Sequence, residues 1–500
     1  MIIKQISNYI FAIYFKKIGG CRMSKAKKNK VRVSFVGTNA ENVTGSSILI
    51  QTENKKILVE CGLYQGDESL LEQYKINKAR FPYKVKDIDY VIVLHSHIDH
   101  VGLIPKLYKQ GATADIIAPV GLQKLFEVMA KDSAFIMERD AEDLEKKFNR
   151  AFEPIYQEKD VYNALEHWNE FEKNEIVEIE EDVKVRFLDS SHIINACQCE
   201  LWIKNNNRTV KIGITSDLGN ISIKNDYVEN FKPIDKANLL IGEATYSREL
   251  KHITTKNRKK DLEKLKTAIE QTCVENKGKV LIPVFALQRC QSILTCLYEI
   301  FKEEDFNVPI VIDSPLAIKI TNVFLGELER TNQAQFKKLQ EVLSWNNIKF
   351  EKEFEGTQAW INNKEPCIFL SCSGMLNAGR AVYTASKLLP QSNNCIIFCG
   401  FSSEGSLGSK IKNKKQKTVT IEGKSVPCRS QVVNLLSFSS HMQREDLLEY
   451  YSNGNYDKIA IVHSEFKSKI SFCEDLQKRL GGKNKTSKVV CVNKNTEILL

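Results

Sequence analysis

The sequence predicts an α/β protein in which a doubly wound parallel-sheet domain is inserted into a first domain. The 500 residues exceed what one ordinary hydrophobic core holds, so two domains are expected. Short strand-like runs crowd the first part of the chain, whereas after about residue 247 they alternate with helical stretches. The last segment, 439–500, again has the pattern of the first part of the chain, which indicates that the chain re-enters the first domain.

The first domain is expected to open with strands at 31–36, 47–50 and 56–62, where apolar residues alternate with polar ones or run together. Consecutive short strands favour a meander. The stretch 121–172 is helix-like, because charged residues separate its apolar positions, and it should cover one face of that sheet.

In the second domain, apolar runs at 280–283, 308–313, 367–370 and 395–398 alternate with helical stretches such as 288–303. This alternation is typical of a parallel sheet with helices on both faces.

The predicted organisation therefore has four parts. Residues 1–30 form a leader, 31–247 the first part of the outer domain, 248–438 the insertion and 439–500 the second part of the outer domain. The apolar run in the leader, 9–15, is too short to cross a bilayer. Lys16, Lys17 and a lysine-rich stretch follow it, whereas a signal peptide places its charge before the apolar run. We expect a disordered leader and no membrane partner.

Composition narrows the class of protein. Lysine and arginine number 72 against 62 aspartates and glutamates, a net charge of +10 that favours an anionic partner. The 14 cysteines are scattered through apolar segments and form no C-x-x-C pair, so neither a zinc ribbon nor a thioredoxin-like motif is indicated. Buried, reduced thiols point to a cytoplasmic protein.

The hexapeptide His95-Ser96-His97-Ile98-Asp99-His100 carries the chemistry. It follows the apolar run 90–94, so it should lie in the loop at a strand's C-terminal end. Imidazole nitrogen and carboxylate oxygen suit Zn²⁺, and burying such groups without partners is costly. In an extended turn, His95 and His97 can serve one ion while Asp99 and His100 serve a second. A polar loop that is merely rich in histidine is the alternative.

His192 and Asp217 could supply missing ligands, because each follows a strand-like run. The two oxygens of Asp217 could bind one metal each. Either residue alone is more often a turn or hydrogen-bonding residue.

The order Glu60, His95 to His100, His192 and Asp217 resembles the metallo-β-lactamase fold, an αββα sandwich with a two-zinc site between its sheets. Three later segments resemble the motifs added in the β-CASP nucleases: 242–246, 437–441 and 462–465. Further segments resemble bacterial and archaeal relatives of the endonuclease subunit of the cleavage and polyadenylation specificity factor: 43–46, 60–66, 282–286, 313–317 and 373–376.

The resemblance implies two Zn²⁺ ions. One would be held by His95, His97, His192 and Asp217, and the other by Asp99, His100, Asp217 and His463. Glu60 would orient a ligand histidine by a hydrogen bond. The family usually has aspartate at that position, so this chain departs from the pattern by one methylene group.

The resemblance also implies a reaction. A hydroxide bridging the two ions would attack a phosphodiester in line, and the products would carry 5′-phosphate and 3′-hydroxyl ends. His441 is the candidate acid for the leaving 3′-oxygen, with Glu243 holding its imidazole in the charged form. For Glu243 the alternative is a strand-end carboxylate that caps a helix or pairs with Arg248.

Three basic features could contact substrate phosphates: Arg248, Arg380 and the run Lys410–Lys417. Each is individually more typical of an ordinary surface or a domain interface.

The function predicted is a zinc-dependent ribonuclease that cuts single-stranded RNA. RNA is preferred to DNA because the DNA-repair branch resembles this pattern with valine at the position of His463. An RNase J-like 5′-exoribonuclease is the nearest alternative, although 37 residues after His463 leave little room for that group's C-terminal oligomerisation domain. A small-molecule metallo-hydrolase or an inactive RNA-processing scaffold is less favoured, and a homodimer stays open.

Overall fold

The computed structural model describes residues 30–205, 208–223, 225–248, 252–400, 402, 405–413 and 417–500. The predicted leader therefore lies outside the described residues except for Lys30, as do residues 414–416 of the basic run.

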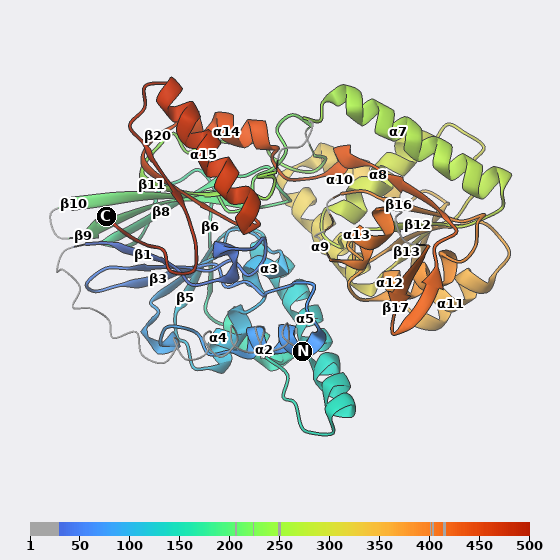
Figure 1. Cartoon of the computed structure of the whole chain (residues 1–500), viewed down its shortest axis with the longest axis horizontal. Helices are drawn as coiled ribbons and strands as arrows, with labels where there is room; N and C mark the ends of the chain where they lie inside the picture. Colours follow the sequence, from blue (N-terminus) through green and yellow to red (C-terminus); the bar gives the residue numbers. More distant parts are fainter. Residues whose placement is uncertain are drawn as a thin grey trace, which may run out of the picture.

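Two sheets stand face to face in the outer domain (Figure 1). Within the described residues the first sheet has the order β22 (Glu497–Leu499), β1 (Arg32–Phe35), β2 (Ile48–Gln51), β3 (Lys56–Val59), β4 (Tyr90–Ile92), β5 (Asp115–Pro119) and β6 (Trp168–Phe171). The second has the order β21 (Lys488–Cys491), β20 (Asn455–Val462), β11 (Lys236–Glu243), β10 (Arg208–Ile214), β9 (Cys197–Asn205), β8 (Val183–Asp189) and β7 (Val177–Glu180). The predicted meander is confirmed, because β1, β2 and β3 pair antiparallel in succession.

The space between the sheets is filled by a buried apolar cluster. Val33 and Ile57 of the first sheet join Leu201, Ile212 and Leu239 of the second in it. This interdigitation of inner faces is what holds a sandwich together.

Helices cover both outer faces (Figure 1). On the first sheet lie α2 (Leu70–Lys78), α3 (Ile98–Val101), α4 (Ile104–Lys109), α5 (Leu122–Phe148) and α6 (Glu158–Leu165), and on the second lie α14 (Arg444–Asn453) and α15 (Phe466–Gly482). The layers are thus αββα, as the resemblance implied.

One local expectation was wrong. The stretch 121–172 ends in the strand β6, which pairs parallel with β5, rather than in helix. The Trp168 ring stacks on Phe126 of α5 at a centroid distance of 4.8 Å, so tertiary packing at the sheet edge overrides the helical pattern.

The inserted domain contains a parallel sheet with helices on both faces. Its order among the described residues is β14 (Ile348–Glu351), β13 (Ile310–Asp313), β15 (Ile368–Ser371), β12 (Val280–Pro283), β16 (Cys395–Phe398) and β19 (Gln431–Asn434). One face packs on α7 (Thr255–Ile269), α8 (Arg289–Phe301), α9 (Pro315–Thr331) and α10 (Gln333–Leu343). The other packs on α11 (Phe354–Asn362), α12 (Arg380–Leu388), α13 (Leu407–Lys412) and the hairpin β17 (Thr418–Ile421) with β18 (Lys424–Pro427).

The chain leaves the outer domain after β11 and returns to it before β20. These two strands pair parallel, with Glu243 opposite Val462. The predicted fold class is therefore confirmed, whereas the boundaries at 247 and 438 stay predictions.

Two sequence expectations concern the whole chain. Every cysteine among the described residues is a free thiol. Across the same residues, helices that combine the length and the apolar content needed to traverse a bilayer are not found.

Candidate metal centre

The candidate ligands lie beyond the C-terminal ends of strands of both sheets, on loops except for Asp99 and His100, which lie within the short helix α3. His95 follows β4, Asp217 follows β10 and His463 follows β20. Across this edge the backbone N–H of Cys197 donates to the carbonyl of Leu94 at 2.9 Å, which ties the two sheets together beside the site.

The first ligand group contains His95, His97, His192 and Asp217, whose ligand atoms all lie within 4.8 Å of one another. The Asp217 Oδ2 atom lies 3.7 Å from His95 Nε2 and 3.5 Å from His192 Nε2. Four atoms at a Zn–N distance of about 2.1 Å in tetrahedral array would stand about 3.4 Å apart, so the spacing suits such an ion.

The second group contains Asp99, His100 and His463, again within 4.8 Å. Asp99 Oδ2 lies 3.5 Å from His463 Nε2 and 3.6 Å from His100 Nε2.

Asp217 stands between the two groups. Its Oδ2 atom faces the first, and its Oδ1 atom lies 3.4 Å from His100 Nε2 and 3.4 Å from His463 Nδ1. Burial alone would raise the pKa of this carboxyl, but His463 and His100 hold the pKa well below its ordinary value. Asp217 is therefore an anion with one oxygen directed at each group.

Glu60 supports the site from the side opposite Asp217. Its carboxylate accepts hydrogen bonds from His100 Nδ1 at 2.7 Å, Ser46 Oγ at 2.6 Å and Ser216 Oγ at 2.6 Å. Ser216 in turn lies 3.1 Å from His95 Nδ1. These contacts occupy the Nδ1 atoms of His100 and His95 and leave both Nε2 atoms facing Asp217.

The donor set fits divalent metal ions. Several buried polar atoms have no hydrogen-bond partner among the described residues: the Nε2 atoms of His95, His100 and His463, and Oδ1 of Asp217. Unpartnered buried nitrogen and oxygen atoms that converge on one another are costly in a protein unless a cation joins them.

Two of the ligand imidazoles differ in protonation. Burial, with a smaller contribution from His95, lowers the pKa of His97 to about 3, so the ring is neutral and able to bind metal. Burial alone would lower the pKa of His100, but Glu60 and Asp217 raise it to about 10. A metal at His100 would have to displace that proton.

The loops are tightly built. Glu60, Ser191, Ser216 and His463 have φ between 49° and 61°, a left-handed conformation that costs a non-glycine residue about 1–3 kcal/mol. Such strained residues gather at functional sites, and all four of these adjoin or belong to the candidate ligands.

His441 and Glu243 lie beside the first group. The rings of His441 and His192 are 4.5 Å apart, and His441 Nδ1 lies 3.8 Å from Glu243 Oε1, without a hydrogen-bond partner of its own in the described structure. Glu243 accepts backbone N–H groups from Leu218 at 3.1 Å and Thr245 at 2.6 Å. The carboxylate is thereby fixed toward the imidazole.

The basic residues lie farther out, and their contact with substrate stays a prediction. Arg248 is exposed and pairs with Glu465. The Arg380 guanidinium donates to Asp313 at 3.1 Å inside the inserted domain. Lys412, in the basic run, donates to the Gly400 carbonyl at 2.7 Å, and burial lowers its pKa to about 8.

Three supporting residues were missed by the sequence reasoning. Ser46 and Ser216 hold Glu60, and Thr245 Oγ1 lies 3.0 Å from His463 Nδ1. Ser46 and Thr245 lie inside segments 43–46 and 242–246, which the sequence analysis identified without giving these two residues a role. The sequence alone does not show which hydroxyl lies near a ligand.

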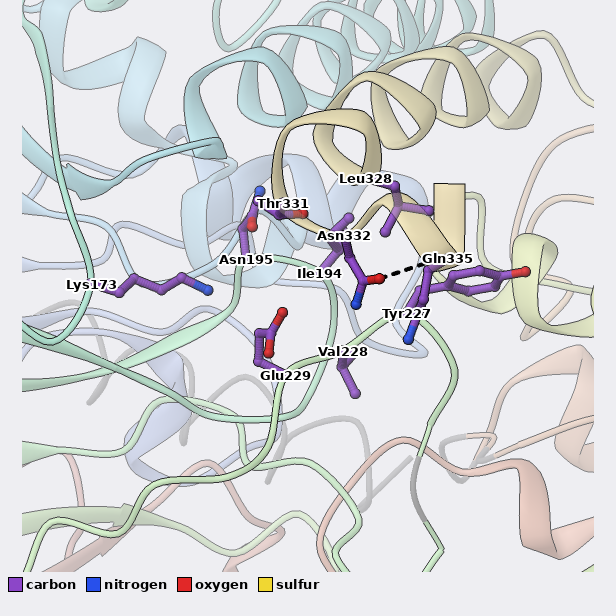
Figure 2. Close-up of a pocket in the computed structure, with 10 residues that line it drawn as sticks. All are labelled: Lys173, Ile194, Asn195, Tyr227, Val228, Glu229, Leu328, Thr331, Asn332 and Gln335. Carbon is purple, nitrogen blue, oxygen red and sulfur yellow. Dashed lines mark hydrogen bonds between the residues drawn. The ribbon is translucent and has the colours of Figure 1, made fainter. Parts of the chain in front are cut away.

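The structure contains two hollows in this part of the molecule, one at the candidate metal centre and one between the domains. One, of about 250 Å³, is lined by site residues including Glu60, His100 and Asp217. The other, of about 330 Å³, lies between the domains, with Lys173 and Glu229 on one side and Asn332 and Gln335 on the other (Figure 2). None of the candidate ligands lines the second hollow.

Family models match three parts of the chain. The metallo-beta-lactamase superfamily matches residues 41–167, the Beta-Casp domain 290–411, and the Zn-dependent metallo-hydrolase RNA specificity domain 425–488.

Several curated proteins are similar over most of the chain. Ribonuclease TTHA0252 from Thermus thermophilus is 27% identical over 85% of this chain and 91% of its own. An RNase J-like protein from Methanocaldococcus jannaschii is 29% identical over 90% and 96%, and the transcription termination factor FttA from the same organism is 27% identical over 90% and 69%. The three family models and the αββα sandwich interrupted by a parallel-sheet domain show that the chain combines a metallo-β-lactamase domain with an inserted Beta-Casp domain and is a metal-dependent hydrolase.

Proposed function

We propose that this protein is a ribonuclease that uses two Zn²⁺ ions to hydrolyse phosphodiester bonds in single-stranded RNA, leaving 5′-phosphate and 3′-hydroxyl ends. The observation that carries the proposal is the position of Asp217, whose two oxygens are directed at two separate groups of ligand atoms. The names of two relatives, Ribonuclease TTHA0252 and an RNase J-like protein, support RNA as the substrate.

In this proposal His95, His97, His192 and Asp217 hold one ion, and Asp99, His100, Asp217 and His463 hold the other. When bound, the pair supplies positive charge for the non-bridging phosphate oxygens and makes a water molecule acidic enough to act as a nucleophile near neutral pH. Glu60 orients the rings of His100 and His95 through the hydrogen bonds described above.

The protein's own groups handle the leaving oxygen. His441 would donate a proton from Nε2 to the departing 3′-oxygen, because its Nδ1 side faces Glu243 at 3.8 Å. The carboxylate of Glu243 would favour the charged imidazole and hold the ring in place.

The amino-acid composition supports a cellular location and a class of substrate. Free thiols among the described cysteines support a cytoplasmic location, and the net charge of +10 favours a polyanionic substrate. Arg248 and Arg380 remain candidates for phosphate contacts.

The experiment that tests the function uses purified protein with single-stranded RNA and DNA of the same sequence, each 5′-labelled, with and without chelator. Cleavage of RNA that stops on chelation is expected, with 5′-phosphate product ends. Failure to cut RNA in the presence of Zn²⁺ would refute the proposal.

A 5′-exonuclease is the second candidate, supported by the 29% identity to the RNase J-like protein. Circular single-stranded RNA separates the two modes. An endonuclease linearises the circle, whereas a 5′-exonuclease leaves it intact.

A further inference from the structure

Arg289 joins the inserted domain to the catalytic segment of the outer domain. It is the first residue of α8, and its Nη2 atom donates to Ser440 Oγ at 3.1 Å. Ser440 is the neighbour of His441. Only 8% of the Arg289 surface is exposed, so the cation is buried beside the candidate acid.

This buried cation has no carboxylate partner among the described residues. The ionisable groups that act on it are the thiols of Cys399 and Cys296, the phenol of Tyr246 and a second arginine, Arg258. Burial lowers the pKa of Arg289 to about 10, which still leaves the guanidinium charged at neutral pH.

Two other arginines of this chain have carboxylate partners within the protein. Arg444 is also buried and pairs with Asp475 at 2.7 Å, and Arg380 pairs with the buried Asp313 at 3.1 Å. A buried charge without such a partner is strongly unfavourable, so the compensating anion at Arg289 should come from a ligand.

The residues around Arg289 indicate where such an anionic ligand would lie. The Tyr246 ring lies 6.0 Å from the His441 ring, and the Tyr246 hydroxyl donates to Ser439 Oγ at 2.6 Å. Arg258 is occupied otherwise, because it stacks 3.5 Å from the Phe438 ring and donates to the Ser437 carbonyl. An anion held by Arg289 would therefore sit on the His441 side of the metal groups.

We propose that Arg289 binds an RNA backbone phosphate one position 5′ of the scissile phosphodiester. The inference rests on the proposed function, in which His441 protonates the departing 3′-oxygen. That oxygen belongs to the nucleotide on the 5′ side, so a cation beside His441 would meet the next phosphate in that direction. A guanidinium suits the task, because its paired N–H groups match two phosphate oxygens.

The test combines protein variants with a charge-deleted substrate. The cleavage site in a short RNA is first mapped with the wild-type protein, and a methylphosphonate then replaces the phosphate one position 5′ of it. Arg289→Met and Arg289→Lys are compared with Arg479→Met, which removes a half-buried arginine of α15 that pairs with Glu445 of α14. Metal content and thermal melting confirm that each variant is folded and loaded.

Arg289→Met is expected to lower kcat/KM on unmodified RNA about ten- to a hundredfold, as expected for a lost charge-assisted hydrogen bond. Arg289→Lys should retain part of the activity, and Arg479→Met should stay near wild type. With the methylphosphonate RNA, kcat/KM of the wild-type protein should fall by a similar factor. For Arg289→Met, kcat/KM should be nearly the same on modified and unmodified RNA. The proposal would be overturned if Arg289→Met left kcat/KM unchanged. It would also be overturned if the substitution and the methylphosphonate each lowered kcat/KM by its full factor when combined.

Binding is measured separately with metal-loaded protein carrying His441→Ala to prevent turnover. Adding Arg289→Met should weaken RNA binding and reduce the slope of log affinity against log salt by about one phosphate contact. If the wild-type protein binds RNA without cutting it, the proposed function fails while the binding result still decides the role of Arg289. If RNA does not bind, both fail.

Discussion

Glu60 accepts a hydrogen bond from Nδ1 of His100 over 2.7 Å, and so directs the other nitrogen of that ring at Asp217. Glu60→Gln removes the charge and leaves the amide unable to accept all the hydrogen bonds that now converge on it. Metal affinity should fall about 10- to 100-fold, the usual effect of losing a group that orients a ligand histidine. Titration of the metal-free protein with Zn²⁺ measures it.

Glu60→Asp is the control for that prediction, because the family usually has aspartate there. The shorter side chain keeps the charge, so affinity should lie between those of the wild type and Glu60→Gln. Equal affinity in all three proteins would show that Glu60 does not orient the ligands.

Asp217→Ala should empty both metal positions, because one carboxylate oxygen faces each group of ligands. Asp99→Ala removes a side chain that faces only the second group, so it should leave one ion bound. Elemental analysis after desalting gives the metal content of each variant. Retention of two ions by Asp217→Ala would contradict the bridging position.

His441→Ala and Glu243→Gln should keep the bound metal and lose RNA cleavage by roughly 10²- to 10⁴-fold, the usual contribution of a general acid. Neither side chain belongs to the two groups of ligand atoms. Metal content and single-turnover cleavage are measured on the same samples. Loss of both ions from His441→Ala would mean that the roles of acid and ligand are assigned wrongly.

Chelation should lower the melting temperature as well as stop RNA cleavage. The unpartnered nitrogens of the site become uncompensated when metal is absent, and a ligand at a thousand times its Kd stabilises the folded state by about 4 kcal/mol. Calorimetry with chelator, and with chelator saturated by excess Zn²⁺ as the control, separates metal loss from effects of the reagent. RNA cleavage that persists after complete metal removal would rule out the mechanism.

Gly62→Ala should destabilise the protein and weaken metal binding, because a Cβ at this position would lie 1.7 Å from the carbonyl oxygen of Asp99. The backbone must move, and helix α3, which carries Asp99 and His100, moves with it. Gly326→Ala is the matched control. It lies within α9 with nothing within 4 Å of the added carbon, so it should stabilise by about 0.5–1 kcal/mol. Chemical denaturation of both variants tests the contrast.

Local sequence patterns were sufficient to predict the position of the histidine hexapeptide and the inserted domain. The histidine hexapeptide follows a buried strand, and the change from clustered strands to alternating strands and helices marks the insertion, because hydrophobic period and turn position are properties of neighbouring residues. The strand β6 escaped prediction, since only its pairing with β5 makes the segment extended.

Only the tertiary structure decided how distant residues act on one another. Pairing of β11 with β20 brings Glu243 opposite Val462, next to His463, and packing of α8 brings the guanidinium of Arg289 to Ser440. The order of residues along the chain contains neither relationship. Both arise because the buried faces of sheets and helices must meet, and where those faces meet decides which polar side chains share a site and which charge is left for a ligand to neutralise.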